Sequence, residues 1–261
     1  PLARDRGAGS VADLVHELRR TPSGPLRDLI VEAMTTNETS FFRDRLPFDA
    51  LRTHVLPELI ATRAATKQLR IWCAASSTGQ EPYSIAMLIR EHFPELATWR
   101  VEIVGTDIST EVLEKARSGV FSQLEVNRGL PAPMLLRWFD QDGPRWRLKD
   151  SVRSMVTFKE LNLAAPWPFK GPFDAIFCRN VMIYFDVAVK ERILGRVATT
   201  LARDGYLFLG AGETPLQMEH AFERIDVDRT SCFRMAADRV GRSPLTPTPP
   251  TPPSLATGGT R

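Results

Sequence analysis

Residues 69–83 read Leu-Arg-Ile-Trp-Cys-Ala-Ala-Ser-Ser-Thr-Gly-Gln-Glu-Pro-Tyr, and this stretch decides the fold. Its apolar first half predicts a β-strand, the small residues up to Gly79 predict a tight loop, and a helix is predicted over Tyr83–His92. Pro82 suits the first turn of that helix, where its missing N–H costs nothing. A second apolar strand, predicted over Val101–Thr106, is followed directly by Asp107. Together these features predict a strand–loop–helix unit with a ligand bound at the loop.

The charges around this loop limit the kind of ligand. Asp107 follows Glu81 by 26 residues, about where dinucleotide-binding folds place the acid that holds ribose hydroxyls. The G-x-G-x-x-G pattern of such folds is absent, and Glu81 puts negative charge at the helix N-terminus, where a pyrophosphate would otherwise bind. A cofactor with a ribose and a cationic end fits better, and S-adenosylmethionine is the common one.

From Leu69 onward, apolar strands alternate with helices, which predicts an α/β fold with a largely parallel sheet covered on both faces. Ser109 is predicted to cap a helix over Thr110–Arg117, and Gly119 to end it. Asp186 is predicted to cap a long helix that Asp204-Gly205 stops. The remaining strands are predicted over Met155–Phe158, Phe173–Cys178, Tyr206–Leu209, Ala221–Val227 and Thr230–Met235.

Composition shifts along the chain predict its domain organisation. Residues 1–9 are expected to be disordered and residues 10–66 to form an N-terminal helical domain, with helices from Val11, from Pro25 and over Phe48–Ala65. Residues 67–242 are expected to form the main domain, interrupted at about 120–154 by an inserted antiparallel β subdomain. The proline-rich residues 243–261 are expected to be a semi-rigid linker toward a further module.

Bulk properties exclude some classes of protein. The 261 residues carry a formal net charge of +3, which permits an acidic protein partner or nucleic acid without arguing for either. No apolar run approaches the ~20 residues that cross a bilayer, so we expect a cytoplasmic protein without membrane insertion. The histidines show no metal-ligand spacing, so no metal is expected. Reduced core thiols are expected at Cys73, Cys178 and Cys232.

The N-terminal helical region also carries a basic outer face. This face is either simply solvated or a dock for an acidic helix. Its basic residues are Arg43, Arg45, Arg52, Arg63, Lys67 and Arg70.

Two further polar motifs point to a site at the carboxyl edge of the sheet. Thr36–Arg43 places hydrogen-bonding groups next to two aromatics and a guanidinium, although alone it suits a capped helix junction. Arg179–Asp186 directly follows the strand Phe173–Cys178, where open α/β folds bind ligands. The chain resembles the chemotaxis receptor glutamate O-methyltransferases (CheR family) from Ser10 to Met235. The resemblance rests on five ordered blocks: Thr35–Arg43, Trp72–Ala86, Gly105–Asp107, Gly171–Asp186 and Gly210–Glu213.

The resemblance implies a fold and a set of site residues. The implied fold is an S-adenosylmethionine-dependent methyltransferase domain, Rossmann-like with a mixed seven-stranded sheet, plus the N-terminal helical domain and the small inserted antiparallel β subdomain. Arg43 and Tyr184 are implied as catalytic. Cofactor contacts are implied for Asn37, Thr39, Arg43, Glu81, Asp107, Asn162, Leu163, Arg179 and Asn180.

Physical chemistry offers a role and a plainer alternative for several of these residues. Asp107 suits ribose hydroxyls as a two-oxygen acceptor, or is only a turn residue at a strand end. Glu81 suits a donor-rich or cationic group, or is an ordinary first-turn charge. Asn162 and Leu163 suit the adenine, and the alternative for Tyr184 is a packed ring with its hydroxyl at the surface.

The implied reaction moves a methyl group from S-adenosylmethionine to a glutamate on the cytoplasmic methylation helices of a chemoreceptor, leaving S-adenosylhomocysteine. A short turn at 142–144 favours direct recognition of those helices over a tethering peptide. One alternative is a nucleic-acid methyltransferase, which the lack of an Asn-Pro-Pro-Tyr strand end disfavours, so no nucleic-acid partner is expected. Another is a non-catalytic receptor-binding module that responds to the cofactor or its product.

Overall fold

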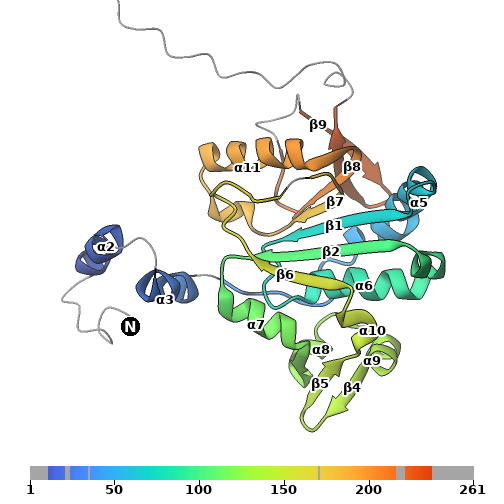
Figure 1. Ribbon diagram of the computed structural model, residues 1–261, viewed down its shortest axis with the longest axis horizontal. Coiled ribbons are helices and arrows are strands. Elements are labelled where there is room, and N and C mark those ends of the chain that lie inside the picture. Colours follow the sequence, from blue (N-terminus) through green and yellow to red (C-terminus); the bar gives the residue numbers. More distant parts are fainter. Residues whose placement is uncertain (1–10, 21–23, 35, 170, 216–220, 237–261) are drawn as a thin grey trace, which may run out of the picture.

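The computed structural model describes residues 11–20, 24–34, 36–169, 171–215 and 221–236, and a seven-stranded sheet runs through its centre (Figure 1). Neighbouring β6, β2, β1, β7 and β8 pair in parallel, and β10 pairs antiparallel with β8 and β9. The sheet is therefore mixed, and the predicted α/β fold is confirmed. In sheet order its strands are β6 (Val156–Glu160), β2 (Arg100–Asp107), β1 (Gln68–Ala74), β7 (Phe173–Cys178), β8 (Leu201–Leu209), β10 (Thr230–Met235) and β9 (Phe222–Val227).

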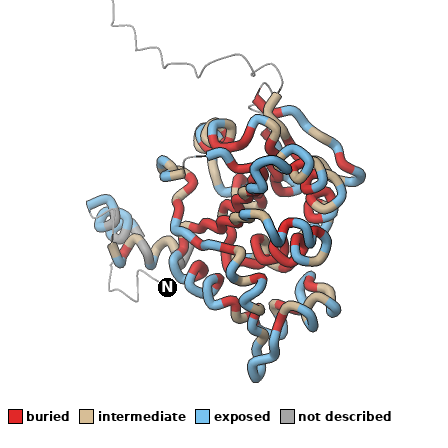
Figure 2. The backbone as a smooth tube through the Cα atoms, turned by 45° about the vertical axis from the view of Figure 1, so that its right-hand side comes forward, coloured by how far each residue is buried: buried red, intermediate tan, exposed pale blue. Residues whose placement is uncertain are grey.

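Helices cover both faces of the sheet because its strands are apolar on both sides. In β1, Ile71 and Cys73 belong to one buried cluster, and Trp72 and Ala74 belong to another. The first cluster includes side chains of α6 (Gln80–His92) and α7 (Thr110–Ser118), and the second includes those of α11 (Val187–Thr200). Buried residues accordingly gather in the middle of the molecule (Figure 2). Burial of successive side chains on both faces is typical of a parallel sheet between two helical layers.

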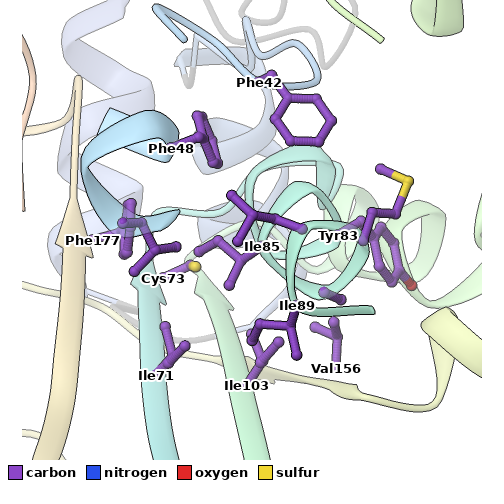
Figure 3. Packing of buried hydrophobic residues seen from close by; sticks show 14 of the residues in the cluster. Phe42, Phe48, Ile71, Cys73, Tyr83, Ile85, Ile89, Ile103, Val156 and Phe177 are labelled. Atoms are coloured by element: carbon purple, nitrogen blue, oxygen red, sulfur yellow. The ribbon is translucent and has the colours of Figure 1, made fainter. Parts of the chain in front are cut away.

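The N-terminal segment that follows residue 40 packs into the first of these clusters. The helix predicted over Phe48–Ala65 runs as α4 (Leu46–Ala50), a π-helical stretch η1 (Leu51–Val55) and α5 (Leu56–Arg63). Phe42 and Phe48 lie in the same cluster as Ile85 of α6 and Ile71 of β1 (Figure 3). The helices α2 (Val11–Arg20) and α3 (Pro25–Met34) lie to the side of this body (Figure 1). Buried residues between 41 and 59 thus share the core of the sheet. The domain boundary near residue 66 stays a prediction.

The insertion between α7 and β6 carries its own antiparallel sheet, in the order β3-β5-β4, as predicted. Three short helices accompany these strands, which the sequence analysis did not foresee. Gly119 ends α7 in a left-handed conformation and Ser109 caps its start, both as predicted. In chain order the elements are β3 (Val120–Ser122), α8 (Gln123–Asn127), α9 (Ala132–Trp138), β4 (Phe139–Asp142), β5 (Arg145–Leu148) and α10 (Asp150–Arg153). Outside the insertion, two short 3₁₀ helices lie between other elements: η2 (Pro94–Thr98) between α6 and β2, and η3 (Met182–Tyr184) between β7 and α11.

Three predicted boundaries were wrong. Helix α6 begins at Gln80 rather than Tyr83, and α11 ends at Thr200 rather than at Asp204-Gly205. As a consequence, β8 begins at Leu201 rather than at the predicted Tyr206, and Asp204-Gly205 lie inside it. The second error has a tertiary cause. Arg63 of α5 forms ion pairs with Asp174 of β7 (2.8 Å) and Asp204 of β8 (2.6 Å), which helps to hold the start of β8 in the sheet. Gly205 suits this strand because a Cβ there would lie 2.9 Å from the carbonyl oxygen of Asp174.

Other expectations have mixed outcomes. Arg63 and Arg70 are engaged inside the chain, Arg70 with Glu102 (3.0 Å), so these two do not belong to a free basic face. Residues 1–9, the linker at 243–261 and the cap at Ser10 lie outside the described residues. Cys73, Cys178 and Cys232 are buried and free, as expected. None of the helices that the structure describes combines the length and the apolar character that crossing a bilayer requires.

Candidate active site

A pocket of about 300 Å³ opens at the carboxyl edge of the sheet. Its walls include residues at or just after the ends of four strands: 75–77 after β1, 107–108 at the end of β2, 161–163 after β6, and 179–181 with 184–185 after β7. The strands β2 and β6 lie on one side of β1, and β7 lies on the other, so the direction in which successive strands are added to the sheet reverses at β1. Such a switch point is where open α/β sheets bind their ligands. Residues Thr36, Asn37, Glu38, Thr39, Arg43 and Glu81 complete the lining.

The loop between β1 and α6 exposes its backbone to this pocket. Ala75 and Ser77 adopt left-handed conformations, with φ values of 53° and 49°, which are sparsely populated for residues with a side chain. The turn is held where the N–H of Ser76 donates to the carbonyl of Thr106 (2.8 Å). The Ser76 hydroxyl is buried and has no hydrogen-bond partner among the described residues. A buried hydroxyl without a partner beside a pocket is suited to a polar ligand.

Asp107 both fixes the loops and faces the pocket. Its carboxylate accepts hydrogen bonds from the backbone N–H of Ser77 (2.8 Å) and of Ser109 (3.1 Å), and the residue is buried. An ionised carboxylate has about four lone-pair positions and only accepts hydrogen bonds, so it suits the hydroxyl donors of a ribose. The turn role and the ribose role considered for Asp107 are therefore compatible.

A chain of charges centred on the buried Arg179 joins three distant parts of the sequence. The Arg179 guanidinium donates to Glu81 (2.8 Å) and Asp44 (2.6 Å), and also to the carbonyl of Arg43 (3.1 Å). The Arg179 side chain is only 1% exposed. Burial raises the pKa of Glu81, and the neighbouring Arg179 guanidinium opposes that rise. Arg179 thus holds the turn that carries Arg43 against the start of α6, and Asp44 is a partner that the sequence analysis missed.

Arg43 lies in an unusual turn. Phe42, Asp44 and Arg45 all have positive φ values, and the N–H of Phe42 donates to the hydroxyl of Ser84 in α6 (2.9 Å). The Arg43 side chain lines the pocket and donates from Nη1 to the carbonyl of Glu38 (2.9 Å). A guanidinium carries five N–H donors, so this bond leaves capacity for a second acceptor.

The other predicted residues come from the edges of the pocket. The Asn162 side-chain oxygen accepts from the N–H of Ala164 (2.9 Å), and Leu163 is buried beside it. Asn180 has a positive φ of 58°, directly after Arg179. Tyr184 lines the pocket yet is 57% exposed, so its ring lies at the mouth.

The structure therefore brings all ten predicted site residues together around one pocket. The further lining residues that the sequence analysis did not name as site residues are Thr36, Glu38, Ala75, Ser76, Ser77, Ile108, Leu161, Val181 and Phe185. Most of them are next to a predicted site residue in the chain. This adjacency was the signal in the sequence from which they could have been predicted. Among the described residues, no group of three or more His, Cys, Asp or Glu is arranged to hold a metal ion.

The fold and this pocket define a methyltransferase that uses S-adenosylmethionine. An acid at the end of β2, an acid at the start of α6 and a small-residue loop with a buried hydroxyl that has no partner among the described residues suit a cofactor with a ribose, a cationic end and polar groups. The sequence matches the family described as "CheR methyltransferase, SAM binding domain" over residues 37–231. The chain belongs to the CheR methyltransferase family.

Curated relatives agree with this assignment. The chain is 46% identical to chemotaxis protein methyltransferase 1 of Pseudomonas aeruginosa and 44% identical to chemotaxis protein methyltransferase Cher2 of Pseudomonas putida, in both cases across 81% of this chain and 78% of the relative. It is 39% identical to a probable chemotaxis protein methyltransferase of Rhizobium etli, across 87% of this chain and 85% of the relative.

Proposed function

We propose that this protein methylates glutamate side chains of a chemoreceptor and so sets the adaptation of a chemosensory pathway, as a protein-glutamate O-methyltransferase. One observation carries the proposal: Arg43 and Tyr184 line the same pocket as the acids suited to the cofactor. The names of the relatives, which are chemotaxis protein methyltransferases, support a receptor as substrate. Location in the cytoplasm belongs to the same proposal.

The residues of the pocket divide into two groups in this proposal. Asp107 would accept from ribose hydroxyls, Glu81 would lie beside the donor-rich end of the cofactor, and Leu163 would pack on its adenine. S-adenosylmethionine, when bound, would supply a methyl group on a sulfonium, so that the acceptor carboxylate gains the O–CH₃ bond while the S–CH₃ bond breaks and S-adenosylhomocysteine leaves as a neutral thioether. Further cofactor contacts are proposed for Asn37, Thr39, Arg43, Asn162, Arg179 and Asn180.

The acceptor carboxylate needs orientation more than activation. A glutamate with an ordinary pKa near ~4.3 is already ionised at neutral pH, so no general base has to remove a proton. Arg43 would orient that carboxylate through a single contact, since a bidentate pair would reduce its nucleophilicity. The hydroxyl of Tyr184 would add a hydrogen bond at the mouth of the pocket. Positioning of this kind, with removal of water, contributes several kcal/mol to catalysis.

The test is a transfer assay with S-adenosylmethionine labelled in its methyl group and a cytoplasmic fragment of a chemoreceptor. We expect label on the fragment that alkali releases, as it releases a carboxyl methyl ester. Label that survives alkali on RNA or DNA would instead support a nucleic-acid methyltransferase. Binding of the cofactor without transfer to either substrate would support a non-catalytic receptor-binding module.

A further inference from the structure

Glu213 connects the loops that follow two neighbouring strands. It lies in the turn after β8, where its N–H donates to the carbonyl of Gly210 (2.9 Å). Its carboxylate accepts from the backbone N–H groups of Asn180 (2.8 Å) and Gly210 (2.6 Å) on one oxygen, and of Met182 (2.7 Å) on the other. Since β7 and β8 pair side by side, this one side chain bridges the ends of both strands.

The loop held by Glu213 is part of the pocket wall. Asn180, Val181 and Tyr184 line the pocket, and the short helix η3 begins at Met182, whose N–H the carboxylate accepts. Asn180 has a positive φ, a conformation that costs energy unless the surrounding structure imposes it. The N–H groups of Asn180 and Met182, the residues before and after Val181, both donate to the Glu213 carboxylate, and these two hydrogen bonds impose such a conformation.

The site accepts little other than a glutamate. A carboxylate only accepts hydrogen bonds, whereas a glutamine would turn its NH₂ group toward one of the three N–H donors. The Glu213 carboxylate also lies very close to the backbone of Gly210. A Cβ at Gly210 would lie 2.6 Å from the Glu213 oxygen and 3.0 Å from the N of Asn180. Glycine at this position therefore makes room for the carboxylate.

We propose that Glu213 is a positioning residue that fixes the loop from Asn180 to Tyr184 in the shape that the pocket requires. Glu213 does not itself line the pocket, so the positioning effect that we propose for it passes through the loop. The part of this proposal that concerns turnover rests on the proposed function, whereas the part that concerns the loop and cofactor affinity does not.

The direct test compares Glu213→Gln with Glu125→Gln. Glu125 is a matched control, because its carboxylate accepts from the N–H and hydroxyl of Ser122 in the insertion, away from the pocket. Titration calorimetry with S-adenosylhomocysteine should show a loss of affinity of about fivefold or more for Glu213→Gln, and turnover on a receptor fragment should fall about tenfold or more. Glu125→Gln should stay within about twofold of the wild type in both measurements, by the same conversion.

A double variant tests whether the effect passes through the loop. In a Tyr184→Phe background, Glu213→Gln should cost less turnover than it does in the wild type, because residues that act as one unit are non-additive. Fully additive losses would overturn the proposal. So would unchanged affinity and turnover in Glu213→Gln with only a lower melting temperature, or an equal loss in Glu125→Gln.

Hydrogen exchange on the wild-type protein keeps the proposal testable if the variant does not fold. The amides of Asn180 and Met182 should exchange slowly, since each donates to the carboxylate, and fast exchange at both would overturn the proposal. A wild-type protein that binds S-adenosylhomocysteine but methylates no receptor would refute the proposed function alone. The affinity and exchange measurements would still decide the role of Glu213.

Discussion

Replacing Arg179 by methionine should destabilise the protein strongly, because it breaks a buried pair of charges. The guanidinium is 1% exposed and bonds Glu81, whose side chain is 13% exposed. Removing one partner of such a pair typically costs about 3–5 kcal/mol, since the other charge stays buried and uncompensated. The Nε of Arg179 is buried without a hydrogen-bond partner among the described residues, which places the expected loss toward the lower end of that range.

Urea and thermal unfolding measure this loss. For a domain of this size the melting temperature shifts by about 2–4 °C per kcal/mol, so a loss of about 3 kcal/mol should lower it by about 6–12 °C. Arg147→Met is the matched control, because Arg147 also pairs with a carboxylate at 2.7 Å, Asp142, but both side chains are 55% exposed. Exposed pairs contribute about 1 kcal/mol or less. Equal losses in Arg147→Met and Arg179→Met would refute the reasoning.

The same variant should change how stability depends on pH. Burial raises the pKa of Glu81 in the folded protein, and Arg179→Met removes the cation that opposes this rise. Below the unfolded pKa of about 4.3 the carboxyl is neutral in both states and costs nothing. As pH rises from there through the higher folded pKa, the unfolded state loses its proton first, so stability falls. The loss relative to the wild type should therefore be larger at pH 8 than at pH 5, and a loss larger at pH 5 would contradict the argument.

Three further outcomes are expected. Asp107→Asn should weaken S-adenosylhomocysteine binding about tenfold in calorimetry, because an amide nitrogen cannot accept a hydrogen bond, and unchanged affinity would argue against the ribose role. Arg43→Lys should lower turnover about tenfold or more while the urea midpoint stays near that of the wild type, because a lysine is not an equivalent orienting group; near-normal turnover would remove Arg43 from the reacting centre. Burial raises the pKa of the Cys73 and Cys178 thiols, so a thiol reagent at pH 8 should label them slowly in the native protein and rapidly in urea. Rapid labelling of native protein would show that these strands open readily.

Local patterns in the sequence were sufficient to predict much of the fold. The apolar strands around residues 71, 103 and 176 and the caps at Ser109, Gly119 and Asp186 depend on neighbours a few residues away, and the structure confirms them. The start of α6 was set at Tyr83 rather than Gln80, although Pro82 was already placed in the first turn of this helix. The end of α11 was set too late because the ion pair between Arg63 and Asp204, which helps to hold the start of β8 in the sheet, joins residues 141 positions apart in the chain.

The sequence by itself determined which polar residues would follow the strand ends, because the carboxyl ends of parallel strands meet at one edge and each motif adjoins its own strand. Only the tertiary structure decided how those residues share their partners. It joins Asp44, Glu81 and Arg179 from three segments, and it gives the Glu213 carboxylate to the loop at Asn180. Such pairings depend on which strands lie side by side, and the order of strands in a sheet is not encoded in any local stretch of residues.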